Sequence, residues 1–189
     1  TDVLRSSIKP KLVLKEWLEE KNRFNLMPDI SIINSAIKVI SKVKRPVIIS
    51  GRGARDSAKE IKQLIKKSNI LYLDTQDSRG LVETSNPNNV YSVRSKVMAE
   101  ADLVILIGRR LDYQLAFGSP AIFKKASFIR ISYIAEELLD NRRGGPEILS
   151  NPSIALNLIS KKIKNYNFDK KWIEKIKKLH RVKIDTLKN

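Results

Sequence analysis

Two short apolar runs that each end at glycine constrain the fold of this chain more than any other feature. The first run, Pro46 to Ser50, leads into Gly51-Arg52-Gly53, and the second, Leu103 to Ile107, leads into Gly108. Both runs are too short for a helix and rich in β-branched residues, so each predicts a β-strand. A strand without a polar face is typical of a parallel sheet that helices cover on both sides.

The remaining segments alternate between helix-like and strand-like patterns. Further strands are expected at 70–73, 90–91, 128–132 and 147–149, and helical segments at 33–40, 55–67, 93–101, 136–139 and from residue 152 onward. Asp29 or Ser31 is the expected N-cap of the first helix, because a short polar side chain accepts a hydrogen bond from the first-turn amides. This alternation predicts an α/β fold with parallel strands.

Sheets of this kind bind ligands at the carboxyl ends of their strands, where these glycines lie. Gly51-Arg52-Gly53 before a helix is half of a dinucleotide-binding loop, because glycine lets the backbone approach a phosphate and the helix start offers free N–H groups. Asp74 follows the second strand, about where an acid would bind a ribose. Asp56, however, stands at the third glycine position and argues against a standard site. A tight turn without a ligand is the alternative.

The second junction, Gly108-Arg109-Arg110-Leu111-Asp112, carries two arginines at the end of a buried strand. Guanidinium groups in this position are suited to clamp phosphates. Asp112 is expected to pair with Arg110 and to fix its direction. The alternative is a surface ion pair that caps the loop and binds nothing.

The formal net charge of +17 has two interpretations. One is a polyanionic partner such as nucleic acid. The other is a Lys- and Ile-rich composition shared across the source organism, which also suits a thermophile. The basic residues are spread over most of the expected helices, and the few aromatic residues are not interleaved with them, so no base-stacking platform is expected. We therefore expect no nucleic-acid partner.

Several features that the sequence lacks indicate where the protein is located. The chain has no cysteine, no apolar run long enough to span a bilayer, and no apolar segment near its start that would form a signal peptide. We expect a cytoplasmic protein without a membrane partner. The first residue is threonine, not methionine, which suggests a fragment or a processed chain.

Catalytic chemistry is sparse. His180 is the single histidine and is expected on the surface of a helix, so no serine has a histidine available as its base. No cluster of acidic residues and histidine has the spacing of metal ligands. The prediction is no catalytic residue and no metal site in this chain.

The segment 161–189 differs from the rest, with eleven Lys and Arg against three Asp and Glu. Trp172, Ile176 and Leu179 fall at helical spacing, which predicts a basic amphipathic helix. Such a helix can lie on a membrane or on nucleic acid. We favour the other interpretation, in which the apolar stripe packs on another domain and the lysines face water.

Taken in order, these segments resemble the central domain of thiamine diphosphate-dependent enzymes, closest to the large, catalytic subunit of acetolactate synthase. The matching pieces are Lys44 to Ala54, Ala101 to Tyr113, Phe117 to Pro120, Ala126 to Ile131, Glu136 to Leu138, Asp140 to Gly144 and Glu147 to Leu149. They cover roughly residues 30–160. The resemblance implies a Rossmann-like domain with about six mostly parallel strands flanked by helices.

The resemblance also implies a nucleotide at the glycine-rich edge. The acetolactate synthase domain holds FAD in a structural role, and relatives that resemble oxalyl-CoA decarboxylase hold an ADP moiety. Carried over by position, the ligand of this chain, whether FAD or ADP/CoA, would meet Gly51, Arg52, Gly53, Ser92, Arg94, Gly108, Arg109, Arg110, Asp112, Ser132, Tyr133 and Glu137. Where the family usually reads Asp-Ile-Asp-Pro, this chain has Ser132 to Ala135. A domain that has lost its nucleotide is therefore an alternative.

Family members bind thiamine diphosphate and Mg²⁺ between two other domains, which this chain lacks. The expected organisation is an N-terminal linker at 1–29, a central domain at 30–160 and a basic helical linker at 161–189. The chain would then be the non-catalytic centre of an acetolactate synthase-like transferase of branched-chain amino acid synthesis, and its partners would be the two other domains. The alternatives are a 2-hydroxyacyl-CoA lyase or oxalyl-CoA decarboxylase-like enzyme, and a free-standing adenine-nucleotide-binding module.

Overall fold

A sheet of five parallel strands forms the centre of the computed structural model, which describes residues 25–139, 145–163 and 167–188. The strands are β1 (Pro46–Ser50), β2 (Leu71–Leu73), β3 (Leu103–Ile107), β4 (Ser127–Ser132) and β5 (Glu147–Leu149). Their order is β2-β1-β3-β4-β5, and every pairing is parallel. The α/β, Rossmann-like class predicted from the sequence is confirmed.

The sheet has one described strand fewer than the six expected. Tyr72 pairs with Asn89 in a single parallel bridge, and the predicted strand at 90–91 goes no further. After Val90 donates its N–H to the Tyr72 carbonyl at 3.1 Å, Val93 donates to the Val90 carbonyl at 3.2 Å. This second bond turns the chain into the 3₁₀-helix η5 (Tyr91–Val93), which leaves the edge of the sheet.

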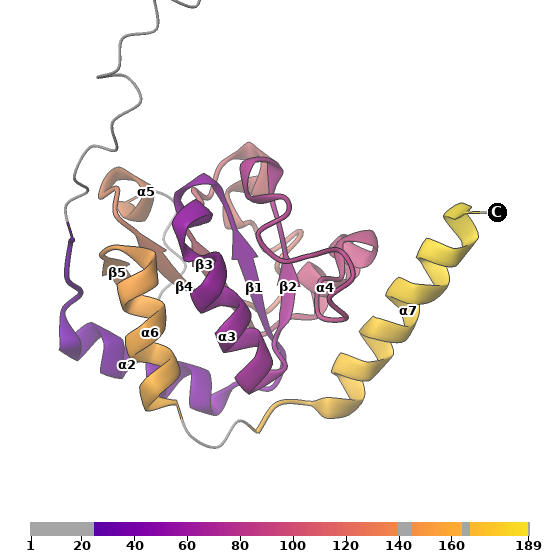
Figure 1. Cartoon of the computed structure of the whole chain (residues 1–189), viewed down its shortest axis with the longest axis horizontal. Helices are drawn as coiled ribbons and strands as arrows, with labels where there is room; N and C mark the ends of the chain where they lie inside the picture. Colours follow the sequence, from indigo (N-terminus) through magenta and orange to yellow (C-terminus); the bar gives the residue numbers. More distant parts are fainter. Residues whose placement is uncertain (1–24, 140–144, 164–166, 189) are drawn as a thin grey trace, which may run out of the picture.

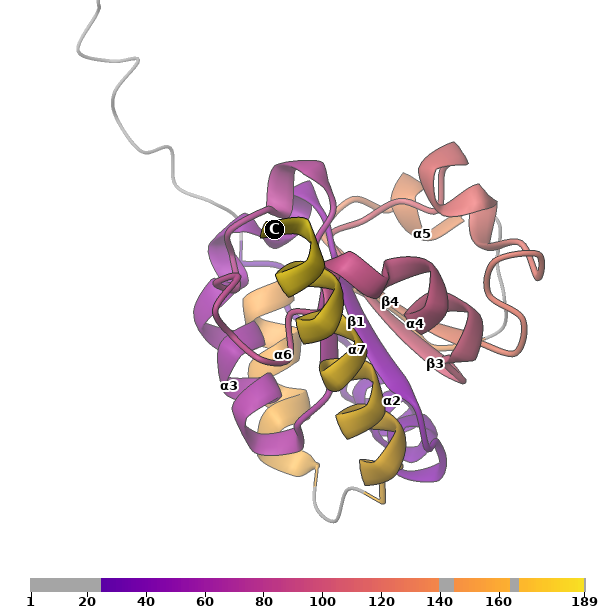
Figure 2. The same ribbon diagram turned by 90° about the vertical axis from the view of Figure 1, so that its right-hand side faces the viewer.

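Helices lie on both faces of the sheet (Figure 2). The helices α3 (Ala58–Ser68) and α6 (Pro152–Lys162) cover one face, and α4 (Arg94–Glu100) covers the other. The other helical elements are α2 (Ile30–Lys42), η3 (Arg52–Ser57), η4 (Gln76–Ser78), η6 (Tyr113–Gly118), α5 (Glu136–Leu139) and α7 (Lys170–Lys188). All residues of β1, β2 and β3 are buried, as strands covered on both faces must be.

The start of α2 follows the sequence prediction. Asp29 is the N-cap and accepts a hydrogen bond from the Ser31 N–H at 2.7 Å, which lowers the pKa of its carboxyl group. The stripe of Ile33, Ala36 and Ile40 is buried, as its spacing predicts.

The helix expected from residue 55 begins differently. Residues 52–57 form the 3₁₀-helix η3, and α3 starts only at Ala58. Ala54 donates its N–H to the Gly51 carbonyl at 3.0 Å, three residues back, and this is the bond that defines a 3₁₀ turn.

Helix α7 packs on the domain itself (Figure 1). Trp172, Ile173 and Ile176 are buried in the same core as the strands, whereas Leu179 is 37% exposed. The Trp172 indole donates to Glu100 at 2.8 Å, and Asp169 pairs with Arg45 at 3.2 Å. The stripe that was expected to meet another domain therefore lies on this one. The boundaries at 29 and 160 stay predictions, and most of the expected N-terminal linker, residues 1–24, is outside the described residues.

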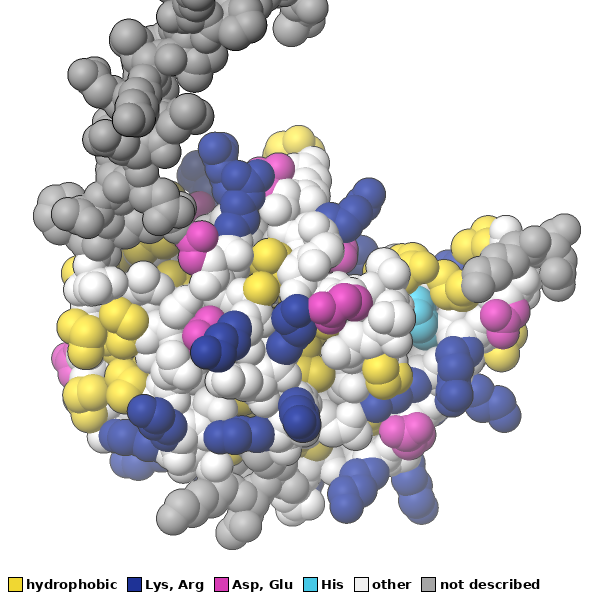
Figure 3. All heavy atoms as spheres, in the orientation of Figure 1, with side chains coloured by type: hydrophobic (Ala, Val, Ile, Leu, Met, Phe, Trp, Pro, Cys, Tyr) yellow, Lys and Arg dark blue, Asp and Glu magenta, His cyan; other side chains and the backbone are white. Residues whose placement is uncertain are grey.

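The basic side chains are scattered, as expected from the sequence. On the face shown in Figure 3, lysine and arginine side chains are spread over the surface singly and in small groups, with acidic groups among them. Several are paired: Lys62 contacts Glu83 at 2.6 Å, and Lys96 contacts Glu100 at 2.8 Å.

The buried phenol of Tyr72 makes the stability of the fold depend on alkaline pH. Its hydroxyl lies 2.6 Å from Ser50 Oγ, and burial, with a smaller contribution from the charge of Asp74, raises the pKa of Tyr72 to about 12. The unfolded phenol ionises near 10. The neutral phenol therefore contributes stability that is complete below pH 10 and is lost as the pH rises toward 12.

We expect the unfolding free energy of the wild type to fall by about 2–3 kcal/mol more than that of Tyr72→Phe between pH 9 and pH 12. Urea titrations of both proteins at several pH values measure this difference. Tyr113→Phe is the control, since Tyr113 is 74% exposed. Parallel losses in the wild type and Tyr72→Phe would contradict the prediction.

Candidate functional site

The carboxyl ends of the parallel strands bring residues from distant parts of the chain to one edge. Gly51 follows β1, Asp74 lies just beyond β2, Gly108 follows β3, and Tyr133 follows β4. The order of the sheet passes from β1 directly to β3, with β2 on the far side of β1. That reversal between β1 and β3 is a topological switch point, which is where open α/β sheets bind ligands.

The glycines at this switch point contact one another. Gly53 donates its N–H to the Gly108 carbonyl at 2.9 Å, and a Cβ at Gly108 would lie 2.3 Å from the Gly53 carbonyl carbon. Gly108 also has φ +55°, a conformation that side chains disfavour. The Gly53 amide, expected to be free for a phosphate, is thus bound to the main chain. The glycines allow two loops to approach each other closely.

Arg109 lies across the first glycine. A Cβ at Gly51 would lie 2.6 Å from Arg109 Cδ, so this side chain covers the backbone that was expected to face a ligand. The guanidinium donates two hydrogen bonds to the Asp112 carboxylate, at 2.7 and 2.8 Å, and one to the side-chain oxygen of Gln114 at 2.8 Å. Asp112 thus pairs with Arg109, not with Arg110 as predicted, because the left-handed turn at Gly108 folds Arg109 back over the loop. Arg110 is exposed and has contacts of its own.

One nitrogen of Arg109 has no partner. Its Nε is buried and makes no hydrogen bond to the part of the chain that the structure describes. A buried donor without an acceptor loses the free energy of its hydration, typically about 1–3 kcal/mol. An acceptor from a ligand or water would satisfy it.

Three arginines lie near Asp74 and Asp112. Arg94 donates to the Asp74 carbonyl oxygen at 2.6 Å. Burial lowers the pKa of Arg94; the charge of Asp74 opposes this, while the charges of Arg109 and Arg79 lower the pKa further. Asp112 already pairs with Arg109, so these three guanidinium groups face two carboxylates, and the one positive charge left over would be offset by an anionic ligand.

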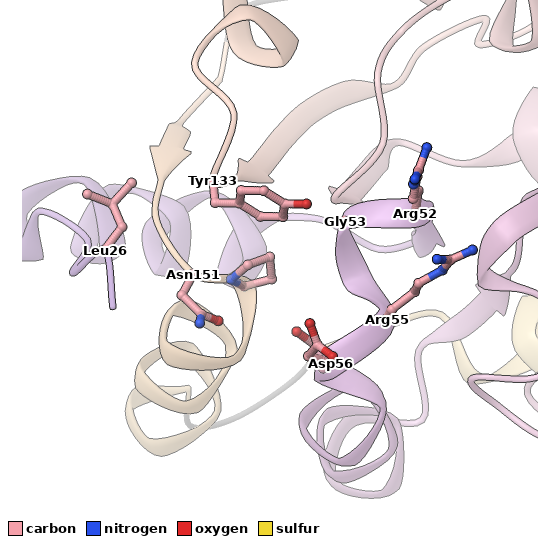
Figure 4. Close-up of a pocket in the computed structure, with 9 residues that line it drawn as sticks. Leu26, Arg52, Gly53, Arg55, Asp56, Tyr133 and Asn151 are labelled. Carbon is pink, nitrogen blue, oxygen red and sulfur yellow. The ribbon is translucent and has the colours of Figure 1, made fainter. Parts of the chain in front are cut away.

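A cavity of about 650 Å³ adjoins the glycines on the side of β4 and β5 (Figure 4). Its walls are Leu26, Arg52, Gly53, Arg55, Asp56, Ser57, Tyr133, Asn151 and Pro152. The ring of the half-exposed Tyr133 extends toward Gly53 (Figure 4). Arg55 is directed to Asp77, with its Nη2 3.8 Å from the carboxylate. Asp56, which argued against a standard phosphate site, does line this cavity.

Ser132 and Glu137 form a closed pair next to the cavity. The buried Ser132 hydroxyl donates to Glu137 Oε2 at 2.7 Å and accepts from the Ile134 N–H at 3.0 Å. This pair orders the turn after β4, where the family pattern has an acid.

Ser92 points away from the other predicted residues. Its hydroxyl lies 2.7 Å from Nδ1 of His180, on α7. His180 is only 7% exposed, so the prediction that it lies on a helix surface is wrong. Its burial follows from the docking of α7, and this docking brings together two residues 88 positions apart in the chain.

The structure thus joins Gly51, Gly53, Gly108, Arg109, Asp112 and Tyr133 at one edge, with Arg94 beside them. Arg79, Gln114 and Asn151 were missed. Asn151 had a recognisable signal, because an Asn-Pro pair before an apolar run is typical of an N-cap, and Asn151 accepts from the Ser153 N–H at 3.0 Å. Arg79 and Gln114 stand in loops that carry no such pattern.

The described residues also bear on two other classes of site. No group of three or more histidine, aspartate and glutamate side chains there is placed to hold a metal ion. Within the same residues, no helix is both long and apolar enough to cross a bilayer.

Comparison with known proteins places the sequence in one family. The model described as "Thiamine pyrophosphate enzyme, central domain" matches residues 33–159. The chain is similar to 2-hydroxyacyl-CoA lyase 1 of Mus musculus, with 33% identity over 76% of this chain and 24% of the relative. It is also similar to the 2-hydroxyacyl-CoA lyase of Arabidopsis thaliana, with 30% identity over 94% of this chain and 33% of the relative.

Oxalyl-CoA decarboxylase of Escherichia coli K12 is a further relative, 32% identical over 62% of this chain and 21% of that enzyme. The matched part of the chain thus spans between about a fifth and a third of the curated relatives. All three are named for acyl-CoA chemistry.

Proposed function

The chain belongs to the thiamine pyrophosphate enzyme family, whose central domain it matches, and on that premise we propose that it holds an adenine nucleotide. The ligand is ADP or the ADP moiety of a coenzyme A compound, bound at the carboxyl edge of β1 and β3. The parent enzyme is a thiamine-dependent lyase or decarboxylase that acts on acyl-CoA compounds.

The observation that carries this proposal is the excess of positive charge at the switch point. Arg79, Arg94 and Arg109 lie there with the carboxylates of Asp74 and Asp112, and Arg109 Nε has no acceptor among the described residues. Guanidinium groups bind phosphate oxygens more strongly than they bind neutral acceptors. A diphosphate supplies both the negative charge and the missing acceptor.

The relatives favour an acyl-CoA enzyme over the acetolactate synthase expected first. Their names are 2-hydroxyacyl-CoA lyase and oxalyl-CoA decarboxylase, and both belong to the first alternative to acetolactate synthase that the sequence suggested. A coenzyme A substrate and an ADP-binding domain share the same adenosine diphosphate chemistry. FAD, the acetolactate synthase ligand, gains no corresponding support.

The thiamine chemistry is proposed to lie outside this chain. The sequence of the chain contains no Gly-Asp-Gly motif. Among the described residues, no cluster of acidic and histidine side chains could hold a metal ion. Thiamine diphosphate and Mg²⁺ do not fit the residues present here, so no step of the reaction is assigned to them. Two further domains of the parent enzyme are the proposed partners, and the cytoplasm is the proposed location.

Isothermal titration of the chain with ADP, AMP and FAD tests the proposal. We expect ADP to bind, and AMP to bind at least tenfold more weakly because it lacks the second phosphate. FAD should bind no more tightly than ADP. Arg109→Lys should weaken ADP binding by about 10- to 100-fold, because lysine keeps the charge but loses the planar fork and the Nε donor.

The control is Lys59→Ala. The Lys59 side chain is exposed on α3, away from the switch point. Its ADP affinity should equal that of the wild type. Absence of ADP binding to the wild type would overturn the proposal and leave a domain that has lost its nucleotide. Equal affinities of the wild type and Arg109→Lys would place the ligand elsewhere.

A further inference from the structure

Helix α7 runs along the edge of the sheet that β2 forms, from the amino ends of the strands toward their carboxyl ends (Figures 1 and 2). Its first turns are fixed near the amino ends. Asp169 donates its N–H to the Lys44 carbonyl at 2.8 Å, and Trp172 donates to Glu100 at 2.8 Å. Its later turns reach η5, at the same edge as the proposed nucleotide site.

The contact with η5 is built around one buried imidazole. His180 Nδ1 lies 2.7 Å from Ser92 Oγ, and the same hydroxyl lies 3.3 Å from the His180 carbonyl oxygen. The ring of Tyr91 packs edge-on against the imidazole with 5.0 Å between ring centroids. Ser92 is therefore held from two sides, and both contacts come from α7.

The segment that Ser92 belongs to has no local cap. Val90 precedes η5 and Val93 precedes α4, and neither side chain can accept a hydrogen bond from a first-turn amide. An uncapped 3₁₀ turn that leads into a seven-residue helix has little stability by itself. Its position then depends on tertiary contacts, and α7 supplies contacts to Ser92.

Arg94 follows Ser92 by two residues and starts α4. Its guanidinium is partly buried where it donates to the Asp74 carbonyl oxygen, and the charges of Arg79 and Arg109 lower its pKa. A cation in such surroundings costs free energy, so its place beside Asp74 depends on how firmly the start of α4 is held. The contact between α7 and Ser92 lies two residues before Arg94.

We propose that His180 is a positioning residue, which holds Ser92 so that Arg94 stays at the nucleotide edge. Helix α7 thereby couples its own docking to the affinity of the site. The proposal rests on the nucleotide-binding function above for its effect on affinity, but its structural part does not.

Because of this coupling, the affinity for the ligand should fall as the pH is lowered. The groups around His180 are Glu174, Lys177, Arg181 and Asp185 on α7, and the facing loop contributes Thr84 to Pro87 and the phenol of Tyr91. Burial lowers the pKa of His180 below its ordinary value of 6.5. The docked helix keeps its full stability above that value and loses stability as the pH falls below it, because the imidazolium is disfavoured where it is buried.

Hydrogen–deuterium exchange of the 189-residue chain tests the structural part, and ADP titration tests the effect on affinity. At pH 7.5 we expect His180→Ala to speed amide exchange in residues 92–97 at least tenfold, with β1 and β3 unchanged, and to weaken ADP binding at least fivefold. His180→Asn should stay within twofold of the wild type in both measurements, since an amide can replace Nδ1. Lys178→Ala, an exposed change on the same helix, is the control.

The pH profile separates positioning from general destabilisation. Between pH 7.5 and pH 5.5 the wild type should lose ADP affinity more steeply than His180→Asn, whose side chain does not titrate. Unchanged exchange in residues 92–97 of His180→Ala, or faster exchange with unchanged affinity, would overturn the proposal. If the wild type binds no ADP, the proposed function fails, and the exchange measurement alone decides whether His180 holds Ser92.

Discussion

Gly108→Ala should lower the free energy of unfolding by about 3–5 kcal/mol, one of the two largest effects that we expect from a single substitution in this chain. Gly108 has φ +55°, a conformation that costs a residue with a Cβ about 1–2 kcal/mol. The new Cβ would also lie 2.3 Å from the Gly53 carbonyl carbon and 2.4 Å from the Ala54 nitrogen. These are backbone atoms, so the loops after β1 and β3 must separate, and the Gly53 hydrogen bond to Gly108 is lost.

Gly80→Ala separates the two contributions. Gly80 has φ +91°, but a Cβ there would have no atom within 4 Å, so only the backbone strain of about 1–2 kcal/mol applies. Urea unfolding of the two variants and the wild type measures both losses. If Gly108→Ala lost no more stability than Gly80→Ala, the close approach of the two loops would not be what requires glycine at the switch point.

Arg130→Met should destabilise the chain by a similar amount, about 3–5 kcal/mol. Arg130 is 3% exposed within β4, and its guanidinium pairs with Glu147 of β5 at 3.0 Å. It also donates to the carbonyl oxygens of Glu137 and Leu138, in α5. Methionine fills much of the space but leaves the carboxylate and both carbonyls without these donors.

The double variant Arg130→Met with Glu147→Met tests the reason for that loss. Removing both charges should restore at least half of the lost stability, because the single change takes the guanidinium away from the Glu147 carboxylate and puts an apolar side chain against it. Thermal unfolding of the two variants beside the wild type measures the recovery. A double variant no more stable than Arg130→Met would show that the bonds to α5, not the pairing with Glu147, carry the effect.

The strands and most helices were predictable because their signals are local. The runs at 46–50 and 103–107 have no polar face, so only a doubly covered parallel strand suits them. The stripe of Ile33, Ala36 and Ile40 and the cap at Asp29 likewise follow from spacing and side-chain chemistry. The predicted strand at 90–91 does not form. Tyr72 and Asn89 make one bridge, and the chain then turns into η5 before a second pair can form.

The site was predictable as a place but not as a set of contacts. Parallel strands bring their carboxyl ends to one edge, so Gly51, Gly108 and Arg109 were expected together. The pairing of Asp112 with Arg109 was not, since it depends on the backbone turn at Gly108. Neither was Arg79, whose approach to Arg94 depends on how a loop folds over β2.

By itself the sequence determined the α/β class, the edge at which the glycines meet and the resemblance to a thiamine enzyme's central domain, because these depend on short sequence patterns. Only the tertiary structure decided that Ser92 meets His180 and that α7 packs on the domain. A contact between residues 88 positions apart has no periodic signature, and it forms only when separate elements pack. The same packing buries His180, which the sequence of its own helix predicted to be on the surface.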